Sequence, residues 1–353
     1  MSASEINVSL SACHKLPRTL ILAGGVGGAR LAQGFYNLYY KMALSEKYLP
    51  AIPDTNELAP AYSSTLPLHI VVNTGDDLEW MGLKVCPDLD TNLYTLAELN
   101  SEKQGWGLKG DTWSALDMLK RWPENPTWFN VGDADLALSL QRTYWLGQGL
   151  NLAQVSRRLC LGLGVQPCLW PMSLEEVSTY VNTPQGALPF QEYFVKGKAQ
   201  ATALSFTYRG LAAAQPLPGL LDLISEAELI VLAPSNPFVS LLPILSLPGV
   251  KQAVQKSSAH KIAISPLVGS RAFKGPLSAM LQTAGLPVSV LGLAQLYSNL
   301  VEKFFLDPQD HSLQKPLMNM HIDTVLADLE LSSKAQRLAL AALVLKEVPS
   351  YVR

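Results

Sequence analysis

The sequence predicts an α/β fold in which a mostly parallel sheet carries an inserted, mainly helical region. Three stretches share one pattern, a short apolar strand that ends in a small or polar break; they are 19–28, 68–77 and 229–237. Helical spacing dominates much of the chain between the second and third of these stretches. Buried strands that end in loops and alternate with helices are typical of an open α/β sheet.

The division of the chain follows from this change of pattern. We expect 1–17 to be a mobile N-terminal extension, and 18–91 together with 218–353 to form the core. Residues 92–217 then form the inserted helical region and a hairpin. A Pro- and Ser-rich stretch at 44–66 is expected to be a surface loop before the second strand.

The first element is a strand that runs into a glycine-rich turn and a helical pattern. Four glycines follow the strand: Gly24, Gly25, Gly27 and Gly28. Such a turn lets backbone N–H groups approach a phosphate at a helix N-terminus, and Arg30 is either a phosphate ligand or a surface residue. The spacing matches neither the dinucleotide fingerprint nor the Walker motif, so the turn alone is a weak signal.

The second strand ends at Asn73-Thr74-Gly75 and is followed by two pairs of carboxylates, Asp76 with Asp77 and Asp88 with Asp90. Ligands of open α/β sheets bind outside the carboxyl ends of the strands. Hard oxygen ligands there suit Mg²⁺, which takes one or two carboxylates together with substrate phosphates. The competing interpretation makes Asp76 and Asp88 turn or helix-cap residues.

The next elements are predicted from the spacing of apolar residues alone. Helical spacing predicts helices at 92–99, 112–121, 136–146 and 152–161. Alternation around a Pro-Gln-Gly turn signal predicts a hairpin of strands 177–181 and 190–195. Later strands are expected at 261–264 and 288–291, and an amphipathic helix at 332–346.

Ser235 and Asn236 follow the strand at 229–232 and offer hydrogen-bonding groups where a short helical turn begins. The plain alternative is an N-cap whose prolines fix the turn. Because several strands end in such polar loops, we expect one composite site along a single edge of the sheet.

Composition excludes several classes of protein. With 353 residues, 48% hydrophobic content and a net charge of −2, the chain can form a sizeable core and gives no electrostatic case for nucleic-acid binding. The four cysteines lack metal-ligand spacing, and no apolar run is long enough for a membrane span. The first seventeen residues lack the apolar core of a signal peptide. These features predict a cytoplasmic enzyme.

With these motifs assembled, the chain resembles the 2-phospho-L-lactate transferases of deazaflavin coenzyme F-420 biosynthesis. The resemblance runs from about residue 20 to 306 and is carried by LAGGVGGAR (22–30), VVNTGDDLEWMGLKVCPDLDT (71–91), GWGLKGDTW (105–113), WFNVGDADLA (128–137), FQEYFV (190–195), APSNP (233–237) and SPLVG (265–269). It implies a Rossmann-like core, Mg²⁺ dependence and a homodimer. It also implies transfer of a phospholactyl-type group from a guanylylated donor to a hydroxyl of the deazaflavin precursor Fo, with release of GMP.

The charges of this reaction and the positions of the motifs then indicate site residues. Asp76 and Asp90 are expected to hold Mg²⁺, directly or through water. Alternatively, one of the four aspartates accepts the proton of the attacking hydroxyl, and Asp90 is the candidate. Asp90, Asn130 and Trp80 are the expected contacts of Fo, and Trp106 is a second candidate for stacking on its flat ring. The residues expected to bind nucleotide phosphates are Gly24, Gly25, Gly27, Gly28, Arg30, Thr74, Ser235 and Asn236.

One position departs from the family pattern: Ala134 stands where members typically have arginine. If that arginine binds an anionic group, Arg142 or Arg30 is the candidate to replace it.

Two other functions compete with transfer. Relatives with a similar glycine-rich start bind nucleotide-sugars and act as regulators, but the second acidic pair and the 128–137 segment favour the transferase. A dinucleotide-dependent oxidoreductase is disfavoured by the glycine spacing.

Overall fold

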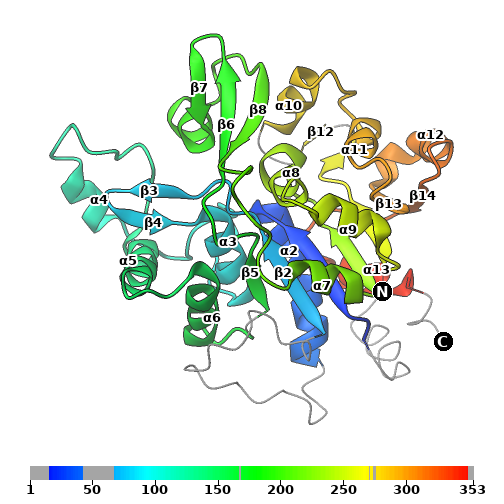
Figure 1. Cartoon of the computed structure of the whole chain (residues 1–353), viewed down its shortest axis with the longest axis horizontal. Coiled ribbons are helices and arrows are strands. Elements are labelled where there is room, and N and C mark those ends of the chain that lie inside the picture. Colours follow the sequence, from blue (N-terminus) through cyan, green and yellow to red (C-terminus); the bar gives the residue numbers. More distant parts are fainter. Residues whose placement is uncertain (1–15, 43–66, 167, 270, 273–275, 349–353) are drawn as a thin grey trace.

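The computed structural model of the chain describes residues 16–42, 67–166, 168–269, 271–272 and 276–348 (Figure 1). The predicted surface loop at 44–66 lies outside these residues. So does the predicted N-terminal extension, apart from Leu16 and Pro17, of which Leu16 packs against the core.

A parallel sheet of seven strands forms the centre of the molecule, and every neighbouring pair of strands runs in the same direction. The strands are, across the sheet, β14 (Asp323–Leu326), β13 (Lys303–Leu306), β10 (His260–Ile264), β9 (Leu229–Leu232), β1 (Thr19–Ala23), β2 (Leu68–Val72) and β5 (Leu169–Pro171). The chain moves from β1 to β2 on one side and later to β9 on the other. The predicted Rossmann-like sheet is thereby confirmed, with a switch point between β1 and β9.

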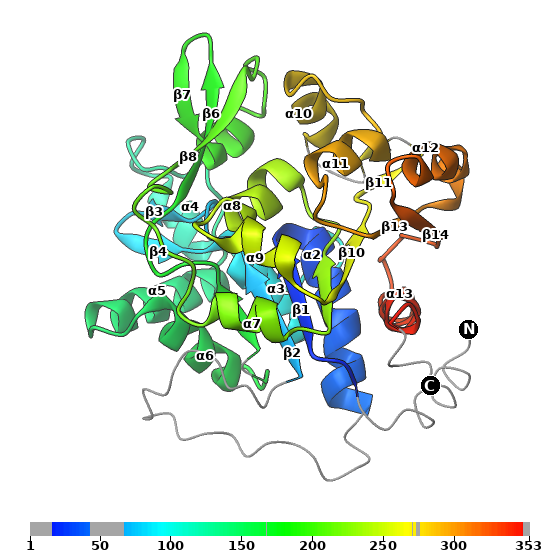
Figure 2. The same cartoon turned by 45° about the vertical axis from the view of Figure 1, so that its right-hand side comes forward.

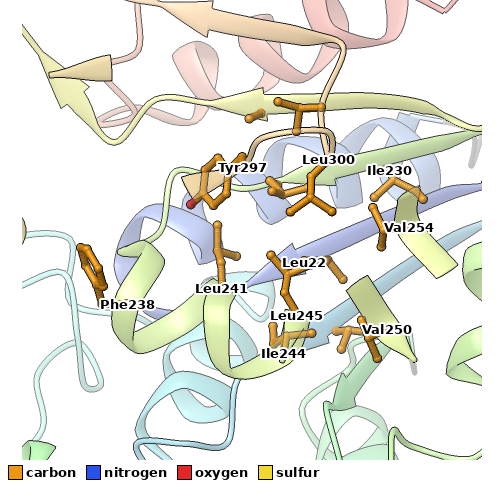
Figure 3. Close-up of a cluster of buried hydrophobic side chains, with 14 of the residues drawn as sticks. Leu22, Ile230, Phe238, Leu241, Ile244, Leu245, Val250, Val254, Tyr297 and Leu300 are labelled. Atoms are coloured by element: carbon orange, nitrogen blue, oxygen red, sulfur yellow. The ribbon is translucent and has the colours of Figure 1, made fainter. Parts of the chain in front are cut away.

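Alternate residues of the strands face opposite layers of helices. Leu20 and Leu22 of β1 belong to one buried cluster, whereas Ile21 and Ala23 belong to the other. The first cluster is completed by helices α7 (Leu220–Glu226), α8 (Leu242–Leu245), α9 (Val250–Lys256), α10 (Leu277–Thr283) and α11 (Val290–Leu296). Figure 3 shows Leu22 and Ile230 of the sheet facing Leu241, Leu245 and other apolar side chains of this layer.

The second layer contains α2 (Gly25–Tyr36), α3 (Pro87–Leu96), α6 (Leu152–Gly162) and α13 (Lys334–Lys346). Since both faces of the sheet are covered, its strands other than the edge strand β14 are buried along almost their whole length, as their apolar sequences require. The remaining helical segments of the described chain are η1 (Asn37–Met42), α4 (Ser114–Leu119), α5 (Asp133–Gly147), η3 (Glu192–Lys196), η4 (Pro237–Leu241), η5 (Pro308–Leu313) and α12 (Gln314–Met318).

Smaller antiparallel sheets lie outside the central one. The largest joins β7 (Gly186–Pro189), β6 (Ser178–Thr183) and β8 (Ser205–Arg209), and it projects from the top of the molecule in Figure 1. The others pair β3 (Leu78–Trp80) with β4 (Leu83–Val85), and β11 (Leu267–Val268) with β12 (Arg271–Ala272).

Three predictions about elements were wrong. The expected strand 288–291 is the start of α11, because Ser289 caps a helix: its Oγ accepts from the N–H of Leu291 at 3.3 Å. The hairpin partner of β6 is β7, and much of 190–195 folds into η3 instead. The helix expected at 92–99 begins at Pro87, because proline suits a first helical position.

The inserted region is mainly helical between 112 and 162, as expected, with α4, α5 and α6 close to their predicted bounds. However, β5 lies inside the segment 92–217 and forms an edge of the central sheet beside β2. The chain therefore returns to the core once before the small antiparallel sheet.

Candidate functional site

A cavity of about 850 Å³ lies at the carboxyl ends of the central strands. Its walls include residues that follow β1, β2, β9, β10 and β14, so the composite site expected along one edge of the sheet is present as a cavity. The cavity lies beside the switch point between β1 and β9, where open α/β sheets bind their ligands.

The glycine turn forms one wall. Gly25, Gly27 and Arg30 line the cavity in the first two turns of α2, and the N-terminus of a helix favours an anion. Ser235 connects this turn to the loop after β9, since its Oγ donates to the carbonyl of Gly24 and accepts from the N–H of Gly24, both at 3.1 Å.

The glycines of this turn have different roles. A Cβ on Gly27 would lie 2.1 Å from the carbonyl oxygen of Pro234, and one on Gly28 would lie 2.5 Å from Ser235 Oγ. Gly24 is equally crowded, by Ser240. These three allow α2 to pack closely against the loop after β9. Gly25 differs, because it has a φ of +25° and a Cβ added there would meet no atom closer than 3.7 Å; its backbone hydrogen-bonds to the carboxylate of Asp88.

Three of the four aspartates line the cavity: Asp76, Asp88 and Asp90. Asp76 lies in the turn after β2, whereas Asp88 and Asp90 lie in the first turn of α3, so the second pair is not on a loop. Asp77 does not line the cavity; it pairs with Lys84 at 3.1 Å. The structure therefore separates one aspartate of the set from the site.

Burial shifts the acidity of these carboxyl groups. Burial raises the pKa of Asp76 well above its ordinary value, and the nearby carboxylates of Asp88 and Asp77 raise it further. Burial also raises the pKa of Asp88 to about 6, although a hydrogen bond from Asn73 Nδ2 at 3.0 Å lowers it. The cluster thus carries more negative charge than its buried surroundings stabilise, which favours a cation or proton there.

Asp90 forms an ion pair with Arg142 of α5, and both side chains are almost fully buried. Burial raises the pKa of Asp90 to about 7, although Arg142 lowers it. Arg142 also donates to the carbonyl of Lys84 at 3.1 Å and does not line the cavity. The suggestion that Arg142 replaces the arginine missing at Ala134 was therefore wrong; Arg30 does line the cavity.

The carboxylates have the chemistry that Mg²⁺ requires. Asp76 Oδ1 and Asp90 Oδ2 are buried and make no hydrogen bond within the described chain. Within those same residues, no group of three or more His, Cys, Asp or Glu side chains is arranged to hold an ion alone. A site with two carboxylates fits an ion whose other ligands are waters and substrate phosphates.

Aromatic side chains line another part of the cavity. They are Trp106, Phe129, Phe190, Phe194 and Tyr94. Phe190 and Phe194 stack on each other with ring centroids 5.4 Å apart, and Trp106 is 41% exposed. Asn130 also lines the cavity. A flat ring can therefore enter beside the carboxylates.

Two predicted site residues do not reach the cavity. Trp80 is only 3% exposed, because it packs with Val85 and Leu116 and its indole N–H donates to the carbonyl of Pro126 at 3.0 Å. Thr74 is buried and does not line the cavity. The prediction that Trp80 stacks on a ligand was therefore wrong, and Thr74 has no access to a phosphate there.

Asn236 has both roles considered for it. Its Oδ1 accepts from the N–H of Phe238 at 3.0 Å, which is the plain N-cap, and the residue also lines the cavity beside Ser235. Sequence reasoning missed the segment 329–332, which lines the cavity after β14, and Asp135, which accepts from the hydroxyl of Tyr94. Asp135 belongs to a recognised motif, but 329–332 has no local signal.

The fold and the cavity together define a doubly wound α/β protein whose ligand site, lined by carboxylates and aromatic rings, lies at the switch point of the sheet. The comparisons with known proteins specify the family. The family model described as 2-phospho-L-lactate transferase CofD matches residues 19–342, and the chain belongs to this family.

Relatives of this chain come from bacteria and a methanogen. A phosphoenolpyruvate transferase of Kitasatospora aureofaciens is 34% identical over 92% of this chain and 97% of its own length. A phosphoenolpyruvate transferase of Mycolicibacterium smegmatis is 33% identical over 83% of this chain and 88% of its own length. A 2-phospho-L-lactate transferase of Methanospirillum hungatei is 30% identical over 90% of this chain and 97% of its own length.

Among solved structures, a Bacillus halodurans protein of the UPF0052 family is similar in fold, with a TM-score of 0.55 and 16% identity over 93% of this chain and 99% of that chain. At this identity the likeness concerns the fold alone. Within the described residues, no individual helix has the length and hydropathy of a membrane span; the bent pair Pro237–Leu245 and Val250–Lys256 meets those criteria only in combination.

Proposed function

We propose that the protein transfers a phosphoenolpyruvyl- or phospholactyl-type group from a guanylyl diphosphate donor to a hydroxyl of the deazaflavin precursor Fo, in coenzyme F-420 biosynthesis. One observation carries the proposal: the glycine turn, the carboxylates and the aromatic side chains line one cavity. A transferase needs both substrates in one place, and this cavity offers distinct chemistry for each.

In the proposed step, an Fo hydroxyl oxygen attacks the donor phosphorus that carries the three-carbon acid. A new P–O bond to Fo forms as the bridging P–O bond to the guanylyl group breaks, and GMP leaves with the bonding electron pair. The hydroxyl proton passes to a carboxylate, for which Asp90 is our candidate because its Oδ2 has no other partner.

The residues of the cavity divide into two groups. Gly25, Gly27, Arg30, Ser235 and Asn236 line the part suited to the nucleotide phosphates. Trp106 and Asn130 line the part suited to Fo. Asp76 would hold Mg²⁺ between the two. Because Arg142 engages Asp90 Oδ1, Asp90 has one free oxygen, which would serve either as a second ligand of the ion or as the proton acceptor. When bound, the ion neutralises charge on the transferring phosphate and orients it.

The test is to incubate the purified protein with Fo and each guanylylated donor, bearing lactate, enolpyruvate or glycerate, and to weigh the product by mass spectrometry. The expected result is a Mg²⁺-dependent product with the mass of Fo plus one phospho-acid less one water, and an equal amount of GMP. A protein that binds a nucleotide-sugar but neither binds nor converts Fo would be a regulator instead. The relatives carry two different donor names, so both donors must be compared.

Two further expectations accompany this function. We propose a homodimer, which light scattering of the purified protein tests. We also propose a cytoplasmic location, which cell fractionation with an antibody to the protein tests.

A further inference from the structure

Arg337 lies on α13, next to the cavity but not in its lining. Its side chain is fully buried, although arginine is rarely buried without partners. Helix α13 packs against α2, the helix that begins at the glycine turn, and Figure 2 shows α13 end-on beneath β13 and β14.

Every N–H donor of the Arg337 guanidinium is used. Its Nε donates to the carbonyl of Leu331 at 2.8 Å, and its Nη2 donates to the carbonyl of Ser332 at 3.2 Å. Its Nη1 and Nη2 form a bidentate pair with the carboxylate of Glu102, and Nη1 also donates to Gln33 Oε1 at 2.7 Å. Five bonds from the five donors fix the orientation of this group and of its partners.

The partners of Arg337 belong to two separate walls of the cavity. Leu331 and Ser332 line it after β14. Glu102 lies in a second segment, a loop whose residues Gln104 and Trp106 also line the cavity. The Arg337 side chain therefore joins two walls that are more than two hundred residues apart in the sequence.

Arg30 shares Glu102 with Arg337 but is bound much less completely. Its Nη2 lies 3.8 Å from Glu102 Oε2, and its buried Nε makes no hydrogen bond within the described chain. The nearest hydrogen bond of Arg30 is a long one, from Nη2 to the carbonyl of Glu102 at 3.4 Å, and Glu330, which also lines the cavity, acts on it only through its charge. Arg30 therefore lines the cavity with an unused donor, Nε, which an anionic ligand would satisfy.

We propose that Arg337 is a positioning residue for the nucleotide end of the cavity. By joining the 329–332 segment to Glu102, it holds the opening around Arg30 in the shape that receives the guanylyl phosphate of the donor. This inference rests on the proposed function for the identity of the ligand, while the joining of the two walls is a property of the protein alone.

The test compares three variants with the wild type. Arg337→Lys keeps the positive charge but loses the bidentate hydrogen bonding of the guanidinium group. Glu102→Gln removes the charge of a half-exposed residue. The matched control is Glu347→Gln, which breaks the 2.6 Å ion pair with Lys303 at the other end of α13, away from the cavity. Two measurements are made: calorimetry of GMP and of Fo separately, and amide hydrogen exchange of the free proteins.

Arg337→Lys and Glu102→Gln should each weaken GMP binding by about tenfold or more, since small misplacements of a site have effects of this size. The affinity for Fo should change less than twofold, and faster amide hydrogen exchange should be confined to residues 99–107 and 327–333. Glu347→Gln should change the affinity for neither GMP nor Fo. Equal loss for both ligands, or no loss, would overturn the proposal, as would exchange spread over the sheet.

The outcomes separate this inference from the proposed function. If the wild type binds no GMP, the proposed function fails. In that case, faster amide exchange confined to the two walls in the Arg337→Lys variant would still support a positioning role for Arg337. Faster exchange spread over the sheet would exclude that role. If Arg337→Lys does not fold, Glu102→Gln decides by the same criteria.

Discussion

Asp90 and Arg142 form an ion pair in which neither side chain has appreciable contact with solvent. Asp90 lies in the first turn of α3 and Arg142 in the middle of α5, so the pair fastens the helical insertion to the carboxylate cluster. The arrangement leaves one Asp90 oxygen, Oδ2, without a partner at the cavity. Arg142 thus engages Oδ1 and leaves Oδ2 as the Asp90 oxygen available for the proposed metal ion or proton.

Replacing Arg142 with methionine should destabilise the protein by roughly 3–5 kcal/mol, because it leaves a buried carboxylate without its counter-charge. Asp90→Asn should be destabilising for the converse reason, so its loss of activity must be judged at a temperature where the variant is folded. Urea unfolding measures both. The control is Lys120→Ala, which removes an exposed ion pair with Asp117 and should cost less than about 1 kcal/mol.

Adjacent aspartates should respond in opposite ways to the same substitution. Asp76→Asn should reduce activity by roughly 10²-fold or more, since metal-assisted charge stabilisation supplies several kcal/mol, while the fold remains intact. Asp77→Asn should mainly reduce stability, because Asp77 pairs with Lys84 and accepts from the thiol of Cys86. Initial rates at varied Mg²⁺ and thermal unfolding test both variants. Equal turnover by wild type and Asp76→Asn would remove Asp76 from the mechanism.

Gly25 and Gly27 should differ when each is replaced by alanine. Gly27→Ala should destabilise the whole protein, because its Cβ would collide with the backbone carbonyl of Pro234. Gly25→Ala meets no close neighbour, but a positive φ is unfavourable for alanine, so the turn should reorient. We expect Gly25→Ala to weaken GMP binding more than Fo binding, measured by calorimetry of each ligand. Unchanged GMP affinity would show that the turn does not hold phosphate.

The tryptophans at 80 and 106 provide a matched pair for Fo binding. Trp106→Ala should weaken Fo binding by about 1–3 kcal/mol, the typical contribution of an aromatic stacking partner. Trp80→Ala should instead reduce stability by roughly 3–5 kcal/mol, as buried aromatic truncations do. Quenching of Fo fluorescence and denaturant unfolding separate the two effects. Normal Fo affinity in Trp106→Ala would direct attention to Phe129 and Phe190.

The Glu102 carboxylate predicts an acid-sensitive contribution to stability. The hydrogen bonds from Arg337 hold the pKa of Glu102 below its ordinary 4.5, although burial opposes them. Because the folded state favours the ionised form, this contribution is complete well above 4.5 and is lost as the pH falls through the lower, folded-state value. The difference in unfolding free energy between wild type and Glu102→Gln should therefore shrink below pH 4.5. A difference independent of pH would show that charge plays no part.

Much of the fold was predictable because its signals are local. The strand, glycine turn and helix at 19–36 follow one another without a break, and α5 and α6 show helical periodicity along their length. The composite site was predictable for a related reason: parallel strands bring their carboxyl ends to one edge, so polar breaks after different strands must meet there.

The rest depends on contacts between distant residues. Both Trp80 and Trp106 lie near site motifs, and only the packing of Trp80 against the chain around Pro126 decides which one is buried. In the same way, Asp90 and Arg142 are 52 residues apart, and nothing in either sequence neighbourhood specifies the other. The segment 329–332 reaches the cavity only because β14 is an edge strand of the same sheet.

The walls of the cavity are drawn from chain segments between Gly25 and Ser332. A ligand that fills the cavity therefore touches early and late parts of the chain at once, and it can bind only after both halves of the sheet have assembled. Its binding energy is then shared by the whole cooperative unit: a ligand at a hundred times its Kd adds about 2.7 kcal/mol to the free energy of unfolding. In a cell, the abundance of folded enzyme would thus follow the supply of its own substrates.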